Sequence, residues 1–346
     1  TAGNGSVVIA DIDTGVNYNH PDLAANMWHN PGEIPGDGID NDLNGKVDDI
    51  YGIDTANNDR DPMDDNGHGT HTAGTVAGVG NNGVGVAGVN WNAKILACKF
   101  LAANGSGSDS NAAACFNYVV ALRNKGINIR VTNNSWGGLR GNGPVPTVLQ
   151  SAIDAAGQAG ILNVVAAGNN NGTNIDTTPF DPASLPSPST LAVAASDQSD
   201  ARAGFSNVGV TSVDLAAPGV SITSTYGSGY AALNGTSMAT PHVAGAAALL
   251  SSIDPTLPMD SLKTVLINSV DHLPAWTGVV ASGGRLNLLN AATAIGAPPA
   301  TRVNVALASN GGTVAASSTI SPSYPASGVN NGDRRGLSWG SGGGWN

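Results

Sequence analysis

The chain has 346 residues, of which 11% are charged and 47 are glycine, and its formal net charge is −11. A chain of this length can bury a large core, and its composition is not that of a disordered protein, which combines low hydrophobicity with high net charge. The acidic balance, with no basic patch, argues against nucleic acid as a partner. No apolar run is long enough to cross a bilayer, so we expect no membrane span.

The first predicted element is a buried strand over residues 6–13, which ends in Asp13 before a Thr14-Gly15 turn. Sheets of α/β proteins hold their sites at the carboxyl ends of strands, so Asp13 is a candidate site residue. The alternative is an aspartate that only ends a strand at a turn.

Residues 37–65 form an acidic loop with ten aspartates, opposed only by Lys46 and Arg60. Within it, residues 40–49 follow the start of a calcium loop, with oxygen-bearing side chains at positions 1, 3 and 5 and glycine at position 6. The glutamate that closes an EF-hand is missing, so this is not an EF-hand. We expect calcium because so many like charges repel one another without a cation, and a solvated acidic loop is the alternative. The predicted ligands are Asp40, Asp42, Asn44, Lys46, Asp48 and Asp49.

Small residues run along a predicted helix that begins near His68. His68 and His71 are three residues apart, which is compatible with a metal pair on one helix face. However, there is no H-E-x-x-H motif, and the oxygen-rich loop next to them would not select zinc. We therefore interpret His68 as a catalytic base at a helix start.

Each of the next two elements carries a cysteine: a strand over residues 93–101 holds Cys98, and a helix over residues 110–124 holds Cys115. A disulfide between them would enclose a loop of about 17 residues and stabilise the fold by about 3 kcal/mol. Two buried free thiols are the alternative.

Strands and helices alternate through the rest of the chain, which predicts an α/β fold with a doubly wound, mostly parallel sheet flanked by helices. The remaining predicted strands cover residues 128–134, 160–167, 191–195 and 213–216, and the remaining predicted helices cover residues 146–159, 261–269 and 284–294.

The stretch 234–245 reads Asn-Gly-Thr-Ser-Met-Ala-Thr-Pro-His-Val-Ala-Gly and continues into an apolar run. A proline is tolerated in a first helical turn, so Pro241 predicts a helix start and places Ser237 at or just inside it. Free N–H groups there can receive developing negative charge, which suits a nucleophile. A simple N-cap serine is the alternative.

Together these pieces resemble the subtilisin-like serine proteases, the subtilase family, over residues 6–295. The motifs that carry the resemblance, in the family's order, are Ile12–Gly15, His20–Leu23, His68–His71, Ala166–Asn169 and Gly235–Ala239. The Gly-Thr-Ser-Met-Ala context of Ser237 also differs from the G-x-S-x-G motif of α/β-hydrolases.

The resemblance implies a catalytic role for each matching residue. Ser237 would be the nucleophile that forms an acyl-enzyme, His68 the general base and Asp13 the acid that orients it. Asn169 and the Ser237 backbone N–H would form the oxyanion hole.

The resemblance also implies two strand edges that hold an extended substrate by main-chain pairing. They are Gly105-Ser106-Gly107 and Ser135-Trp136-Gly137. Asp109 falls near a pocket of the family, where it would favour basic groups.

Two further calcium sites are implied by the same resemblance. The first would use Asp22 and Asn82 with the carbonyls of Val79, Val84 and Val86. The second, a thermitase-like loop, would use Asp54, Asp59 and Asp61 with the Met63 carbonyl.

The two ends of the chain depart from this family. Only 12 residues precede Asp13, so we expect the family's longer N-terminal arm, which helps to hold the first calcium, and its pro-domain to be missing. We expect a peptidase domain over residues 1–296 and a proline-containing linker over residues 297–302. Residues 303–346 resemble the truncated start of a galactose-binding-like β-sandwich of the discoidin or factor 5/8 type C kind.

The expected function is that of a secreted, calcium-stabilised serine endopeptidase, monomeric, acting on extended polypeptides. We expect the sequence to be an internal fragment of a larger extracellular protein. The alternative is a binding module whose tail directs the protein to glycans or surfaces. The residue preference at the cleaved bond is left open.

Overall fold

Nine strands form the central sheet of this computed structural model, which describes residues 2–57, 59–141 and 143–297. The strand order is β12-β13-β9-β8-β6-β4-β1-β3-β2. Neighbouring strands pair in parallel, except for the antiparallel pair β12–β13 at one edge. The strands are β1 (Val8–Asp13), β2 (Gly52–Asp54), β3 (Lys94–Lys99), β4 (Ile129–Asn134), β6 (Leu162–Ala166), β8 (Thr190–Ser196), β9 (Leu215–Pro218), β12 (Asp271–His272) and β13 (Gly284–Arg285).

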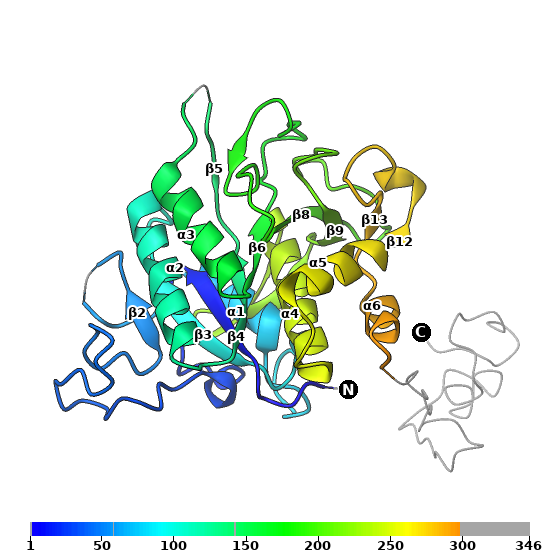
Figure 1. The fold of residues 1–346 in the computed structure, drawn as a ribbon. Helices are drawn as coiled ribbons and strands as arrows, with labels where there is room; N and C mark the ends of the chain where they lie inside the picture. Colours follow the sequence, from blue (N-terminus) through cyan, green and yellow to red (C-terminus); the bar gives the residue numbers. More distant parts are fainter. Residues whose placement is uncertain (1, 58, 142, 298–346) are drawn as a thin grey trace, which may run out of the picture. The chain divides into compact units, whose positions relative to one another are not determined.

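Helices cover both faces of this sheet (Figure 1). One hydrophobic cluster joins one face to α2 and α3, and another joins the opposite face to α1, α4, α5 and α6. This arrangement confirms the predicted α/β fold with a mostly parallel sheet between helices. The helices are α1 (His68–Ala77), α2 (Asp109–Asn124), α3 (Thr147–Gln158), α4 (Thr236–Ile253), α5 (Met259–Asn268) and α6 (Leu288–Ala294).

Alternating residues of β1 supply both clusters, because successive side chains of a strand point to opposite faces. Val8, Ala10 and Ile12 belong to the cluster of α2 and α3, whereas Ile9 belongs to that of α1 and α4. By the same alternation Asp13 lies on the face of α1 and α4. The carboxyl end of β1 therefore presents its acid to the two helices that carry the candidate base and nucleophile.

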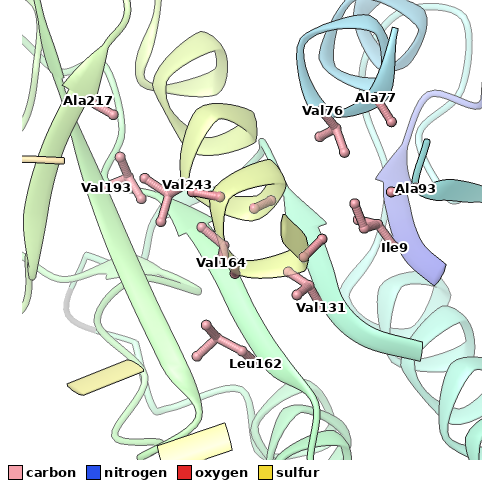
Figure 2. Packing of buried hydrophobic residues seen from close by; sticks show 14 of the residues in the cluster. Ile9, Val76, Ala77, Ala93, Val131, Leu162, Val164, Val193, Ala217 and Val243 are labelled. Carbon is pink, nitrogen blue, oxygen red and sulfur yellow. The ribbon is translucent and has the colours of Figure 1, made fainter. Parts of the chain in front are cut away.

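The core under α1 and α4 is built from small aliphatic side chains (Figure 2). Val243 of α4 lies against Val164 and Val193 of the sheet, and Val76 of α1 lies near Ile9. Small side chains let both helices lie close to the strands, and each buried valine contributes about 1.5–3 kcal/mol. This close packing fixes the starts of α1 and α4 relative to the sheet.

Two antiparallel pairs lie outside the central sheet. β10 (Ile222–Tyr226) and β11 (Gly229–Leu233) form a hairpin that contacts α1 and leads directly into α4. β5 (Gly138–Leu139) pairs with β7 (Phe180–Asp181). Short 3-10 turns cover residues 24–26 and 274–276.

Three local expectations differ from the structure. Residues 284–294 are not all helical, because Arg285 pairs with Ala216 of β9 before α6 begins at Leu288. The acidic loop contains the short strand β2, which pairs with β3. Pro241 lies inside α4 and not in its first turn, since the helix already begins at Thr236.

The described part of the chain forms one compact unit that ends at Ala297. The predicted β-sandwich start over residues 303–346 and most of the predicted linker lie outside the described residues. Among residues 2–297, none of the helices combines the length and the apolar character that crossing a bilayer requires.

Candidate active site

An acid–base pair lies where β1 ends and α1 begins. His68 Nδ1–H donates a hydrogen bond of 2.7 Å to Asp13 Oδ1, which also accepts the Thr14 N–H at 2.7 Å. The Asp13 side chain is fully buried, while the His68 side chain is 28% exposed. Thus Asp13 fixes the tautomer of His68, and the far edge of the imidazole stays accessible.

Two opposing effects act on the pKa of His68. Burial lowers it, but the charge of Asp13 and the hydrogen bond to Asp13, with smaller effects of negative charge at Asp11 and Asp64, outweigh burial and raise the pKa from 6.5 to about 9. The imidazolium is therefore strongly stabilised at this position. This is the property that a base needs when it takes up a proton during a reaction.

His71 has a different role from His68. Its Nε2 lies 3.0 Å from the Ile222 carbonyl and 3.2 Å from the Ala231 carbonyl, one on each strand of the β10–β11 hairpin. Burial lowers the pKa of His71. A neutral His71 thus fastens the hairpin to α1, and the metal pair considered from the sequence is not formed.

Ser237 is the second residue of α4, at the helix end that adjoins the hairpin. Its Oγ donates to the Ser135 carbonyl at 2.8 Å, and the Ser135 Oγ donates back to the Ser237 carbonyl at 2.9 Å. Pro241 explains the second bond, since it has no N–H for the carbonyl four residues before it. Among the described residues, Ser237 Oγ makes no hydrogen bond to His68.

Asn169 follows β6 and faces the start of α4. Its Oδ1 accepts the Thr236 N–H at 2.9 Å and the Thr236 hydroxyl at 3.1 Å. This orients the amide, because the oxygen is held and Nδ2–H₂ is turned away from Thr236. Asn169 is exposed, so its amide donors can reach a bound group.

A cleft of about 520 Å³ lies beside this site. Of the predicted substrate-binding residues, Gly105, Ser106, Gly107, Trp136 and Gly137 line it. The rings of Phe100 and Trp136 meet edge to face there, with centroids 4.6 Å apart. Ser135 is buried instead and contacts Ser237.

Charged side chains also line the cleft. Arg140 makes two hydrogen bonds to the Asp181 carboxylate, with Nε at 2.7 Å from Oδ2, so these charges offset each other. Asp109, at the start of α2, is exposed. Asp109 therefore places a negative charge at this end of the cleft.

The structure has a disulfide between Cys98 and Cys115, one of the two states that the sequence left open. It joins β3 to α2 across 17 residues. Since α2 follows the segment 105–107, this bond fixes one wall of the cleft to the sheet.

The acidic loop brings together three carboxylates that can hold a metal ion. Glu33, Asp42 and Asp49 each place an oxygen within 4.8 Å of the others. Glu33 and Asp49 are buried. Hard oxygen ligands of this kind suit calcium. The sequence prediction missed Glu33, although it is the only glutamate in the chain.

Neutral donors and one lysine surround these carboxylates. The amides of Asn30 and Asn44 donate to both Asp42 and Asp49, and the Tyr118 hydroxyl donates to Asp49 at 2.6 Å. Lys125 lies 3.2 Å from Asp42. One lysine cannot balance three carboxylates, so the cluster fits a divalent cation.

Two other predicted ligands of this loop accept hydrogen bonds from its backbone. Asp40 accepts the backbone N–H groups of Asn44 and Gly45, and Asp48 accepts those of Gly36 and Gly38. Lys46 lines a cavity that Asp49 of the carboxylate cluster also lines. Local turns therefore use the carboxylates of Asp40 and Asp48.

The residues of the first implied calcium site are joined by hydrogen bonds to Asp22. Asp22 accepts the Asn82 amide at 2.6 Å and the Val86 N–H at 2.7 Å, and the Asn82 oxygen accepts the Val84 N–H. Val79 donates its N–H to the Asp22 carbonyl at 2.9 Å.

The carboxylates of the second implied calcium site line two cavities. Asp54 lines one cavity, and Asp59 and Asp61 line another, with Arg60 lining both. Met63 donates its N–H to Asp61 at 3.1 Å.

Comparison with known proteins gives consistent matches. The Subtilase family profile matches residues 4–291. The thermophilic serine proteinase of Bacillus sp. (strain AK1) is 40% identical over 294 residues, which are 85% of this chain and 63% of that protein. Thermitase of Thermoactinomyces vulgaris is 39% identical over 82% of this chain and 87% of thermitase.

Solved structures agree with these matches. A cold-adapted subtilisin-like serine proteinase aligns with a TM-score of 0.61 and 33% identity, over 81% of this chain and 86% of that one. The chain spans about half the length of several curated relatives that it matches.

Proposed function

The chain belongs to the subtilase family of subtilisin-like serine proteases, and from this premise we propose that it is an endopeptidase that cuts extended polypeptides. The nucleophile is Ser237, the general base is His68, and Asp13 orients the base. The observation that carries the proposal is the 2.7 Å hydrogen bond from His68 to the buried Asp13, beside the start of α4.

The reaction proceeds in two halves. The Ser237 Oγ forms a bond to the carbonyl carbon of the cleaved peptide while His68 Nε2 takes the hydroxyl proton. The C–N bond then breaks, His68 gives that proton to the leaving amine, and an ester remains on Ser237. Water attacks the ester with His68 again as the base, which releases the acid and restores the serine.

One rotation precedes this chemistry. The Ser237 Oγ donates to the Ser135 carbonyl in the resting site, and it must turn to His68 before it can lose its proton. Hydrogen bonds of catalytic groups often tighten only when substrate binds. The Ser135 hydroxyl keeps the Ser237 backbone in place meanwhile, through its bond to the Ser237 carbonyl.

The oxyanion is stabilised by two donors. Asn169 Nδ2–H₂ is free because the Asn169 oxygen is bound to Thr236. The Ser237 N–H lies in the first turn of α4, where backbone donors have no intrahelical acceptor. Both donors meet the negative charge that develops on the carbonyl oxygen.

Substrate binds as an added strand. The segments 105–107 and 135–137 contribute to the substrate cleft and are rich in small side chains, which permits main-chain pairing with a peptide. The ring pair of Phe100 and Trp136 offers an apolar surface for one substrate side chain. Asp109 favours a basic group at that end.

Calcium stabilises the enzyme at the acidic loop. Glu33, Asp42 and Asp49 would hold the ion, because they supply three carboxylates against one lysine. A bound cation there offsets their mutual repulsion and supplies no step of the reaction.

We also propose that the protein acts outside the cell. Disulfides persist in oxidising compartments, and the disulfide between Cys98 and Cys115 supports such a location.

The substitution Ser237→Ala tests the proposal. It removes the nucleophile, so we expect kcat/KM on a peptide library to fall by at least about 10³-fold. Cleavage products are identified by mass spectrometry. Ser199→Ala, at an exposed serine in a turn, is the matched control and keeps wild-type activity. A Ser237→Ala enzyme that cuts at the wild-type rate would refute the proposal.

A further inference from the structure

Asp11 is a buried carboxyl group that the proposed mechanism does not use. It lies on β1, two residues before Asp13, and is 1% exposed. The strands on either side pair Ala97 and Asn133 with it. Among the described residues, no lysine or arginine makes an ion pair with Asp11. A buried acid without a cation needs another explanation.

The hydrogen bonds of Asp11 fit a neutral carboxylic acid. Asn133 Nδ2 donates to Asp11 Oδ1 at 2.7 Å, and the Thr72 Oγ1 lies 3.2 Å from Asp11 Oδ1 and 3.1 Å from Asp11 Oδ2. The Thr72 hydroxyl also donates to the Gly69 carbonyl at 3.0 Å. A hydroxyl has one proton for these three acceptors, so a proton on Asp11 would let Thr72 donate to Gly69 and accept from Asp11 at the same time.

The surroundings of Asp11 also favour its neutral form. Burial and then the negative charge of Asp13 raise the pKa of Asp11 well above its usual value, against the smaller effects of Asn133, Thr72 and His68. Asp13 on the same strand and His68 on α1 are the titratable neighbours, whereas Asn133 of β4 and Thr72 of α1 are neutral. Two carboxylates this close disfavour double ionisation.

A continuous set of hydrogen bonds runs from Asp11 to the nucleophile. Asn133 Nδ2, which binds Asp11, also lies 3.2 Å from the Ser135 Oγ. The Ser135 Oγ in turn donates to the Ser237 carbonyl at 2.9 Å. That carbonyl is free to accept because Pro241 has no N–H. Through Asp11 and Asn133, these hydrogen bonds link β1, the strand of Asp13, to the segment of Ser237.

We propose that Asp11 is a positioning residue, a neutral carboxylic acid that aligns β1, α1 and the Ser237 segment through Asn133 and Thr72. The inference rests on the proposed function, since it concerns the positions of that triad. An apolar side chain would leave the amide of Asn133 unpaired. An ionised acid would add a second negative charge near His68, which raises the pKa of the imidazole further and moves the onset of activity to higher pH.

Two variants of Asp11 distinguish its role in alignment from an effect of its charge. Asp11→Leu removes both hydrogen bonds, and we expect kcat to fall at least about tenfold with little change in KM, since small misplacements of reacting groups lower rates strongly. Asp11→Asn accepts from Asn133 and donates to Thr72 as the neutral acid does, so it recovers most of that loss. An Asp11→Leu enzyme with wild-type kcat would overturn the alignment role.

The pH dependence of kcat/KM shows whether Asp11 is ionised. If Asp11 is neutral, the acid limb of kcat/KM in Asp11→Asn stays within about 0.2 pH unit of wild type. If Asp11 is ionised, its replacement removes a negative charge near His68 and moves that limb down by about half a pH unit or more. The second outcome contradicts the proposal.

A spectroscopic measurement does not depend on activity or on the leucine variant. The chain with Ser237→Ala, which cannot digest itself, is labelled with aspartate carrying ¹³C at the side-chain carboxyl. The resonance absent after Asp11→Asn is that of Asp11. It should not titrate between about pH 5 and pH 8, and a midpoint below about pH 5 would refute the neutral state. Failure of the triad itself appears separately, as activity that survives Ser237→Ala.

Discussion

Asn169 illustrates how one hydrogen bond can set the direction of a functional side chain. An amide can face a neighbour with either its oxygen or its nitrogen. Here the Thr236 N–H lies 2.9 Å from the side-chain amide of Asn169. Only the amide oxygen can accept a hydrogen bond from it, so the atom that faces Thr236 is Oδ1. The two amide protons of Asn169 are therefore turned away from Thr236, and in the proposed reaction they donate to the oxyanion.

The substitution Asn169→Ala tests this role. Loss of one oxyanion donor should lower kcat by about 10²–10³-fold and change KM little, because the donor acts mainly on the transition state. Steady-state kinetics on one peptide give both constants. Asn290→Ala, at an exposed asparagine of α6, is the control and should match wild type. An equal rise in KM with unchanged kcat would assign Asn169 to substrate binding instead.

The pKa of His68 predicts the pH dependence of activity. His68 accepts a proton only when neutral, and Asp13 raises the pKa of His68 from 6.5 towards about 9. The rate constant kcat/KM should therefore rise with pH through a midpoint between these values. The contribution of the His68–Asp13 pair to stability runs the other way, because it is full below 6.5 and is lost as pH rises towards about 9.

Stopped assays over about pH 5–10 measure the midpoint, and urea unfolding over the same range measures stability. An activity midpoint at or below the ordinary histidine value of 6.5 would contradict the raised pKa of His68.

At the scale of elements, the start of α1 lies against the turn that follows β1. A side chain at Gly69 would meet this turn, since a Cβ there would lie 2.1 Å from the Gly15 carbonyl oxygen and 3.1 Å from the Asp13 Cβ. The absence of a side chain at Gly69 lets His68 reach Asp13. Helix–strand packing and catalytic geometry therefore depend on the same residue.

The substitution Gly69→Ala should push α1 away from β1. Overpacking of this kind costs about 1–3 kcal/mol of unfolding free energy, and a shift of His68 should lower kcat/KM by about 10–100-fold. Urea unfolding and steady-state kinetics check the two effects. Gly204→Ala is the matched control, because nothing lies within 4 Å of a Cβ at that position. If Gly69→Ala and Gly204→Ala had the same unfolding free energy and the same kcat/KM, α1 would tolerate a side chain at Gly69, and this prediction would be wrong.

Local patterns predicted the elements that carry the site, because Asp13 ends an apolar strand and His68 opens a run of small residues. They could not predict Pro241 inside α4, since the hydroxyl that uses the freed carbonyl comes from Ser135, far away in the chain. Two-residue strands such as β13 are too short to show a period. Glu33 was missed because only the folded loop brings it to Asp42 and Asp49.

At the scale of the whole molecule, the negative charge is concentrated at one edge of the sheet. The acidic loop, residues 37–65, includes β2 at that edge. Tyr118 of α2 and Lys125 at its end bind Asp49 and Asp42, so the loop is fastened to α2 as well. A cation at the carboxylate cluster would therefore stabilise the loop, the sheet edge and the helix that follows the substrate segment together.

Removal of calcium should lower the stability of the whole domain. A ligand that binds only the folded state stabilises it by about 2.7 kcal/mol at 100 times its Kd, so chelation should lower Tm by several degrees, measured by calorimetry on the Ser237→Ala chain. Asp49→Asn should remove most of this shift. Asp40→Asn should keep it, because Asp40 binds only the backbone of its own turn. If Asp40→Asn lost more of the Tm shift than Asp49→Asn, the ligands would be those of the calcium-loop pattern predicted for residues 40–49. If chelation left Tm unchanged, the proposed calcium site would be wrong.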